Sequence, residues 1–163
     1  RCAGRVVWWT TIRRLLTLTL VMGWSPRQID FVLAFPQADT RTNLFMEVPS
    51  HFEVQNGELA RDSRAPHPRH QPNVLKLLKN LYGLKDAGLT WFEHLKDGLT
   101  ARGFKQSLVE PCMFIRGSLI LLVYIDDCVA ICPNQAPITE FIDSCLFYPS
   151  HPADQEDRFT LRC

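Results

Sequence analysis

We predict an α+β fold in which helices pack on one face of an antiparallel sheet. Three patterns carry this prediction. Residues 28–35 form a short apolar run typical of a strand, residues 86–102 repeat apolar side chains at helical spacing, and residues 114–131 form a β-branched and aliphatic run long enough for a hairpin. The length of 163 residues suits a single domain, which would bury about 70% of its unfolded surface.

The remaining elements follow from apolar runs and chain breaks. In chain order we predict a helix over 10–23, the strand over 28–35 ending in a turn near Pro36, a short strand over 44–48, mostly loop over 49–73, and a strand or irregular segment over 74–81. In the central helix, apolar residues recur at every fourth position from Ala87 to Leu99, and Gly103 terminates it. We interpret this stripe, which contains Trp91, as core packing rather than a ligand-binding surface.

The predicted hairpin carries two adjacent carboxylates, Asp126 and Asp127, at the centre of an apolar run over 118–132. Surrounding an ionised carboxylate with apolar residues is costly unless something compensates its charge. Two interpretations fit the pair equally well, because Asp is common in tight turns and adjacent carboxylates can also bind a cation. A third carboxylate elsewhere in the chain is needed to decide between them.

Asp30 is the candidate third carboxylate, since it is a lone acid within the apolar run over 28–35. By itself it fits a strand-end residue that faces solvent. If the strands bring it to Asp126 and Asp127, the three would form an oxygen-rich site of the kind that Mg²⁺ prefers. Two ions about 3.5–4 Å apart stabilise both the attacking and the leaving oxygen of a phosphoryl displacement. The predicted chemistry is nucleotidyl transfer.

Five motifs occur in an order and spacing that resemble the copia-type LTR retrotransposon reverse transcriptases. The resemblance extends from about Val7 to Pro133 and rests on the combination, because a single Tyr-x-Asp-Asp arises by chance. The motifs are Gln28-Ile29-Asp30-Phe31-Val32-Leu33-Ala34-Phe35, Leu81-Tyr82-Gly83-Leu84-Lys85, Trp91-Phe92, Glu110-Pro111-Cys112-Met113-Phe114 and Tyr124-Ile125-Asp126-Asp127.

The resemblance implies a reverse-transcriptase palm and RNA-directed DNA polymerase activity. It assigns Asp30, Asp126 and Asp127 as catalytic, metal-binding residues, with Asp126 the surer ligand of the adjacent pair. Two Mg²⁺ ions, or Mn²⁺ in their place, are the implied cofactors. The implied partners are an RNA or DNA template-primer and deoxynucleotides. Other segments of a Pol polyprotein, ribonuclease H and integrase, are expected but lie outside this chain.

Three further positions take substrate-binding roles by resemblance. Phe35 matches the aromatic residue beneath the incoming sugar, where a ring would collide with a ribose 2′-hydroxyl and favour deoxynucleotides. Without the resemblance it would be interpreted as an ordinary core aromatic. Tyr124 would pack near the primer end. Lys85 fits a substrate contact and a solvated surface lysine equally well.

Departures from the family pattern limit the activity that we expect. Where the family has Gln after its Tyr-Gly-Leu-Lys, this chain has Asp86, an acceptor-only anion, and Leu89 replaces a basic residue. Both changes should weaken nucleic-acid binding. We expect a partial fingers and palm domain over residues 1–133 and a divergent, frameshifted or disordered tail over 134–163. The alternative to an active polymerase is a catalytically inactive remnant with at most weak nucleic-acid or metal binding.

Charge and hydropathy add weaker constraints. The net charge is +1, yet residues 1–105 hold 15 Lys and Arg against 9 Asp and Glu, and residues 106–163 hold 3 against 8. A groove that follows phosphates and a solvated basic face explain this asymmetry equally well. The longest early apolar stretch, residues 15–24, is too short to span a bilayer. Six cysteines without paired spacing indicate a reduced, intracellular protein, and the family resemblance implies a cytoplasmic virus-like particle.

Overall fold

The computed structural model describes residues 7–47, 52–55, 58–61, 74–146 and 160–162. Its helices are α1 (Trp9–Met22), α2 (Ala34–Gln37), α3 (Ala87–Ala101) and α4 (Ala136–Leu146). Its strands are β1 (Ser25–Val32), β2 (Asp39–Glu47), β3 (Phe52–Gln55), β4 (Glu58–Arg61), β5 (Val74–Lys79), β6 (Lys105–Gln106), β7 (Met113–Arg116), β8 (Leu119–Tyr124), β9 (Asp127–Cys132) and β10 (Thr160–Arg162). The predicted α+β class is confirmed.

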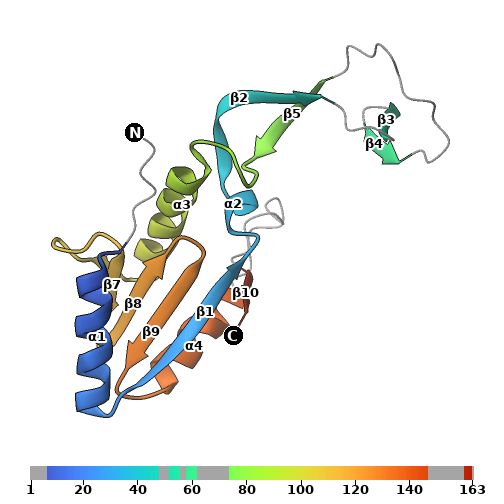
Figure 1. Cartoon of the computed structure of the whole chain (residues 1–163). Helices are drawn as coiled ribbons and strands as arrows, with labels where there is room; N and C mark the ends of the chain where they lie inside the picture. The colour runs from blue at the N-terminus through green and yellow to red at the C-terminus, as the bar shows by residue number, and fades with distance from the viewer. Residues whose placement is uncertain (1–6, 48–51, 56–57, 62–73, 147–159, 163) are drawn as a thin grey trace.

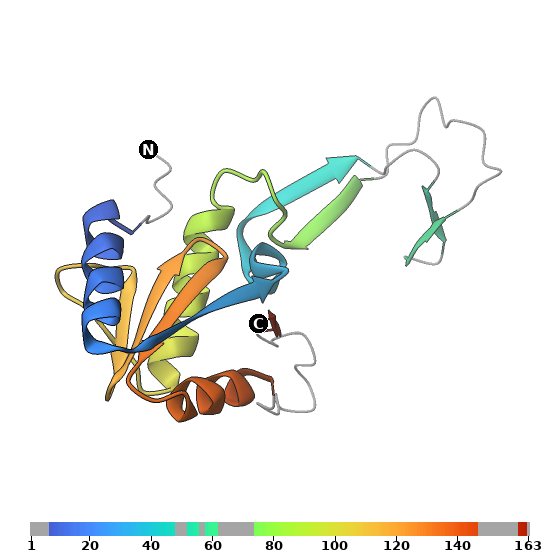
Figure 2. The same ribbon diagram turned by 60° about the horizontal axis from the view of Figure 1, so that its bottom comes forward.

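Six strands form one antiparallel sheet in the order β10-β1-β9-β8-β7-β6. Strands β7, β8 and β9 are consecutive in the chain and adjacent in the sheet. Strand β1 comes from much earlier in the sequence and pairs along β9. Figures 1 and 2 show α3 and α4 against the same face of this sheet, while α1 runs beside its β7 end.

The hydrophobic core lies between this face and the two helices. Side chains alternate along a strand, so every second residue of β1, β8 and β9 points toward the helices. The predicted apolar stripe of α3 is confirmed as core. Among the described residues, the largest fully buried side chains of this core are Trp91, Phe31, Phe114, Phe141, Ile29, Leu95, Leu119, Leu121, Ile138 and Val123. Thr19 of α1 and Ile131 of β9 are also fully buried.

A buried carboxylate fixes the first turn of α1. Glu110 is only 2% exposed. Its Oε2 accepts hydrogen bonds from the Trp8 N–H at 3.0 Å and the Thr11 hydroxyl at 3.2 Å, and its Oε1 accepts one from the Cys112 N–H at 3.2 Å. The side chain of Trp8 makes no cap at this end. The carboxylate of Glu110, from a distant loop, instead accepts from the Trp8 N–H and interacts favourably with the positive end of the helix dipole. At the other end, α1 stops at Gly23, which has a φ of 65°.

The predicted strand over 28–35 ends earlier than expected. Strand β1 runs to Val32, and Leu33 then takes a left-handed φ of 53°. The placement of Phe35 in a strand is therefore wrong, because Phe35 lies in the short helix α2. The side-chain amide of Gln37 donates to the Val32 carbonyl at 2.6 Å and holds this turn against the end of β1. An apolar run alone did not reveal the change of direction at Leu33.

Two smaller pairings lie outside the main sheet. Strands β2 and β5 form a ribbon that extends beyond the end of β1 (Figure 1). The predicted strands over 44–48 and 74–81 belong to it, although β2 already begins at Asp39. Strands β3 and β4 pair within the segment predicted to be mostly loop, and this pairing was not predicted. The rest of that segment lies outside the described residues.

The predicted hairpin over 114–131 is a three-stranded meander. Phe114 belongs to β7, and Gly117, with a φ of 58°, turns the chain into β8. Part of the tail predicted over 134–163 packs into the same core, since Ile138 and Phe141 of α4 are fully buried. Whether this tail keeps its ancestral reading frame stays a prediction. Within the described ranges, no helix is both long and apolar enough to cross a membrane.

Candidate active site

The tight turn between β8 and β9 carries the two adjacent carboxylates. Tyr124 and Asp127 are the last residues paired across the two strands, so Ile125 and Asp126 form a two-residue loop. Ile125 has a φ of 59°. Positive φ at the first loop position alone is the type II′ pattern, which normally uses glycine. A β-branched residue there costs about 1–3 kcal/mol, so surrounding contacts must hold the turn in place.

Strand β1 brings Asp30 directly beside this turn. Asp30 lies opposite Asp127 in the register of β1 and β9, and the Phe31 N–H donates to the Asp126 carbonyl oxygen at 2.9 Å. Residues directly opposite each other on antiparallel strands point to the same face of the sheet. Pairs that do not exchange backbone hydrogen bonds with each other approach most closely, and Asp30 and Asp127 form such a pair. Since Ile29 and Phe31 point into the core, Asp30 and Asp127 share the face turned away from α3 and α4.

The three carboxylates meet along the backbone, but their side chains do not converge. In the part of the chain that the structure describes, no three His, Cys, Asp or Glu side chains are gathered into a metal-binding arrangement. Instead, the side-chain amide of Gln28 donates to Asp127 Oδ1 at 3.1 Å. Like charges repel, and this bond directs one carboxylate toward a neutral donor rather than toward its acidic neighbours. The donor set consists of carboxylate oxygens and is of the kind that fits Mg²⁺.

Two aromatic rings lie near the carboxylates. Phe35 packs against Tyr82, with ring centroids 4.6 Å apart and planes inclined by 56°. Partial burial raises the pKa of Tyr82, and the negative charges of Asp126 and Asp30 raise it further. The Tyr82 hydroxyl is therefore within the electrostatic field of two of the three candidate ligands. Phe35 lies just after the strand that carries Asp30, and it contacts the ring of Tyr82, whose pKa the charges of Asp30 and Asp126 raise.

The other two candidate substrate residues lie in different places. Tyr124 is opposite Asp127 across the turn, shares its face, and is 45% exposed. Lys85 instead lines a cavity of about 210 Å³ together with Arg41 and Asp86, and none of the three carboxylates lines this cavity. The structure thus brings Tyr124 to the carboxylates and groups Lys85 with the residue that replaces the family's Gln.

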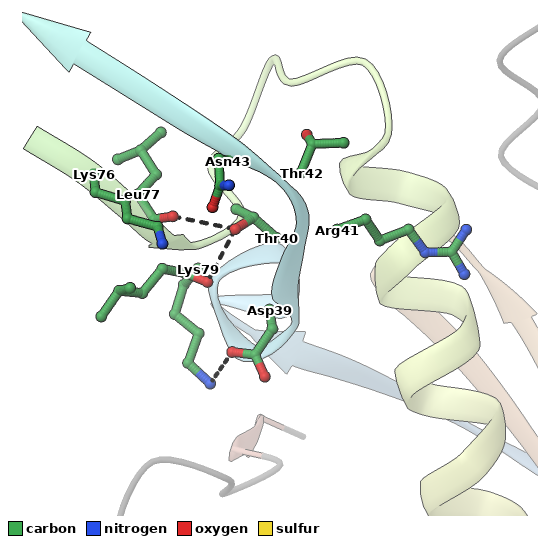
Figure 3. Close-up of a pocket in the computed structure, with 9 residues that line it drawn as sticks. Asp39, Thr40, Arg41, Thr42, Asn43, Lys76, Leu77 and Lys79 are labelled. Carbon is green, nitrogen blue, oxygen red and sulfur yellow. Dashed lines mark hydrogen bonds and ion pairs between the residues drawn. The ribbon is translucent and has the colours of Figure 1, made fainter.

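A larger cavity of about 360 Å³ opens on the ribbon where the register of β2 and β5 shifts (Figure 3). The Thr40 hydroxyl donates to a backbone carbonyl of β5 at 3.1 Å. Lys79 pairs with Asp39 at 3.0 Å, and Arg41 pairs with Glu93 of α3. Because two of its three basic side chains have acidic partners, this cavity supplies little uncompensated positive charge for a phosphate.

Sequence reasoning missed three contributors to this site. Gln28 and Tyr82 lie within the quoted motifs, yet neither was given a role. Trp91 was interpreted only as core, although its indole Nε1–H donates to the Ile125 carbonyl oxygen at 2.8 Å. A buried tryptophan usually finds a partner for its N–H, and this signal could have pointed from α3 to a backbone carbonyl nearby.

An antiparallel sheet that presents three carboxylates at a hairpin turn, with helices behind it, has the architecture of the palm domains of nucleic-acid polymerases. A family model described as "Reverse transcriptase (RNA-dependent DNA polymerase)" matches residues 2–145. The chain belongs to this family.

The relatives are copia-type, as the motifs predict. The Pol polyprotein from transposon TNT 1-94 of Nicotiana tabacum is 30% identical over 127 residues, which is 75% of this chain. The Pol polyprotein from transposon RE1 of Arabidopsis thaliana is 34% identical over 72% of the chain. The Ty1-BL Gag-Pol polyprotein of Saccharomyces cerevisiae is 25% identical over 78%. No solved structure gives a significant match.

The matched region is a small part of each relative. The chain spans 9%, 7% and 6% of the lengths of these three polyproteins.

Proposed function

We propose that this chain is the palm of an RNA-directed DNA polymerase of a copia-like retrotransposon, and that it transfers nucleotides from deoxynucleoside triphosphates to a primer 3′-hydroxyl. The observation that carries the proposal is the register that sets Asp30 opposite Asp127, beside the turn that holds Asp126. The chain's membership of the reverse-transcriptase family supports the same reaction class.

Asp30 and Asp126, assisted by Asp127, would hold two Mg²⁺ ions, with Mn²⁺ as a substitute. When bound, such ions stabilise the attacking and leaving oxygens of a phosphoryl displacement. Phe35 would lie beneath the incoming sugar and exclude a ribose 2′-hydroxyl. The exposed ring of Tyr124 would support the primer end. Lys85 would contribute to nucleotide binding from its own cavity.

The partners in this proposal are an RNA or DNA template-primer and deoxynucleotides. The other segments of the Pol polyprotein, ribonuclease H and integrase, would act on the same nucleic acid. The place of action would be a cytoplasmic virus-like particle.

A catalytically silent palm is the second candidate. Two observations favour it: the carboxylate of Asp86 lines the same cavity as Lys85, and the Asp127 carboxylate is turned to Gln28. An anion beside the candidate nucleotide-binding lysine would repel a triphosphate. Such a remnant would keep the fold and at most weak nucleic-acid or metal binding.

Primer extension on an RNA template, with Mg²⁺ or Mn²⁺ and deoxynucleotides, separates the two candidates. The unmutated chain should incorporate nucleotides, and Asp126→Asn should lower the rate about a thousandfold, because metal-ion catalysis supplies several kcal/mol. Asp97→Asn, an exposed substitution on α3, is the matched control and should leave the rate unchanged. No incorporation by the folded, unmutated chain with either ion would favour the silent palm.

A further inference from the structure

Three contacts join the catalytic turn to the strand that carries Asp30. The Trp91 indole N–H donates to the Ile125 carbonyl oxygen at 2.8 Å. The ring of Trp91 meets that of Phe31 edge to face, with centroids 5.5 Å apart. The Phe31 N–H in turn donates to the Asp126 carbonyl oxygen at 2.9 Å. One side chain of α3 therefore contacts both of the segments that must be held together.

The turn needs this support because its backbone is strained. Ile125 adopts a φ of 59°, which β-branched residues rarely adopt. Its carbonyl oxygen accepts its hydrogen bond from a buried donor, and Trp91 is only 1% exposed. The bond is partly buried, because its acceptor residue Ile125 is 38% exposed. A buried donor needs a partner, so the indole N–H favours the turn conformation that offers it this carbonyl oxygen.

We propose that Trp91 is a positioning residue for the polymerase reaction, whose indole N–H and ring fix the turn of Asp126 against the strand of Asp30. This inference rests on the proposed function for its catalytic meaning. Trp91 touches neither substrate nor metal ion in this proposal. It acts through the backbone of the turn and sets how far the carboxylates of Asp30 and Asp126 lie from each other.

The test uses the full chain and three proteins. Trp91→Phe keeps a buried ring and removes the N–H. Leu99→Val is the matched control, because Leu99 is equally buried in the same helix but lies at its far end. The unmutated chain supplies a reference within itself, since Trp9 is 63% exposed and its indole N–H exchanges with solvent.

The first measurement is indole hydrogen exchange by NMR, with the Trp91 signal assigned from its proximity to the ring of Phe31. We expect the Trp91 N–H to exchange at least about 100-fold more slowly than that of Trp9. Equal exchange rates would overturn the proposal. Both signals come from the unmutated chain, so the comparison tests the proposal even if Trp91→Phe does not fold.

The second measurement is Mn²⁺ binding, followed from the signal of free Mn²⁺ by electron paramagnetic resonance. Trp91→Phe should weaken binding about three- to tenfold, the equivalent of one neutral hydrogen bond. Leu99→Val should lower the melting temperature without changing Mn²⁺ affinity by more than about twofold. If the two variants lose affinity in step with their melting temperatures, Trp91 is merely structural and the proposal fails.

The third measurement is primer extension, where Trp91→Phe should lower kcat by about tenfold and leave the KM for the deoxynucleotide unchanged. A kcat within about twofold of the unmutated value would refute the positioning role. If the unmutated chain extends no primer, the proposed function fails by itself, and Mn²⁺ binding then decides the role of Trp91. An unmutated chain that neither extends a primer nor binds Mn²⁺ overturns both proposals.

Discussion

Glu110→Gln is the sharpest test of how α1 is held to the rest of the fold. The substitution conserves shape but exchanges one carboxylate oxygen for an amide NH₂ group. At present Oε2 accepts from two donors, Trp8 N–H and Thr11 Oγ1, and Oε1 accepts from Cys112 N–H. In the best orientation, glutamine keeps the first two bonds and turns its NH₂ group toward the Cys112 N–H.

The expected cost follows from these contacts. A hydrogen bond to a charged group contributes roughly 1.5–3 kcal/mol, and a buried donor left without a partner costs about 1–3 kcal/mol. Glu110 is 2% exposed, so water does not replace the lost bond. We expect Glu110→Gln to lower the free energy of unfolding by about 2–4 kcal/mol. For a chain of this size, that corresponds to a fall in melting temperature of about 5–15 °C.

Urea unfolding followed by circular dichroism measures this change. Glu140→Gln is the matched control, because Glu140 pairs with Arg116 at 3.5 Å on the surface with 75% of its side chain exposed. Exposed pairs contribute little, so the control should change stability by less than about 0.5 kcal/mol. If Glu110→Gln behaved like Glu140→Gln, the buried carboxylate would not be what anchors α1.

Three further outcomes follow from the structure. Burial raises the pKa of the Cys128 thiol to about 12, whereas the unfolded thiol ionises near 9.0. The contribution of Cys128 to the unfolding free energy should therefore fall by about 1.4 kcal/mol per pH unit between these values. Urea titrations should show a shallower alkaline fall for Cys128→Ala, with the remainder coming from groups such as Cys145, whose pKa burial also raises; an unchanged slope would contradict the burial argument. Gly23→Ala should lower the free energy of unfolding by about 1 kcal/mol, because Gly23 has a φ of 65° although the space around it is open. Gly88→Ala, inside α3 and with equal space, should raise it by about 0.5–1 kcal/mol. Equal effects in thermal melts would contradict the backbone argument. Tyr82→Ala removes the ring that packs against Phe35 and should lower the preference for deoxynucleotides over ribonucleotides about three- to tenfold. Tyr82→Phe keeps a ring and should keep this preference. An unchanged preference in Tyr82→Ala would show that Tyr82 does not support Phe35.

Local periodicity explains which elements could be predicted. The predicted helices over 10–23 and 86–102 agree with α1 and α3. The apolar residues of α3 repeat on one face, and each helix is followed by a glycine with positive φ. The site required long-range information that periodicity does not contain. Only the pairing of β1 with β9 sets Asp30 opposite Asp127, and the order of motifs in the family was the sole sequence signal for it.

The errors have equally specific causes. Phe35 was placed in a strand because Ala34 and Phe35 continue the apolar run, whereas Leu33 breaks the strand by taking a φ of 53°. Leucine carries no sequence signal for this conformation, as glycine or asparagine would. The role of Trp91 was hidden for a different reason. A helical stripe predicts which side chains are buried, but it does not predict that one buried edge carries a donor whose acceptor lies in another element.

Asp86, one of the two departures from the family pattern, lies in a cavity that none of the residues holding the turn lines. Asp86 precedes α3 and lines the cavity of Lys85, whereas the turn is held by Trp91, Phe31 and the pairing of β1 with β9. Substitutions at Asp86 can weaken substrate binding without loosening the contacts of Trp91 and Phe31 with the turn. The contacts that hold the turn are thus separate from the cavity that Lys85 and Asp86 line. A chain of this kind can keep the geometry of a polymerase turn while its substrate contacts change, which is why metal binding and primer extension have to be measured independently.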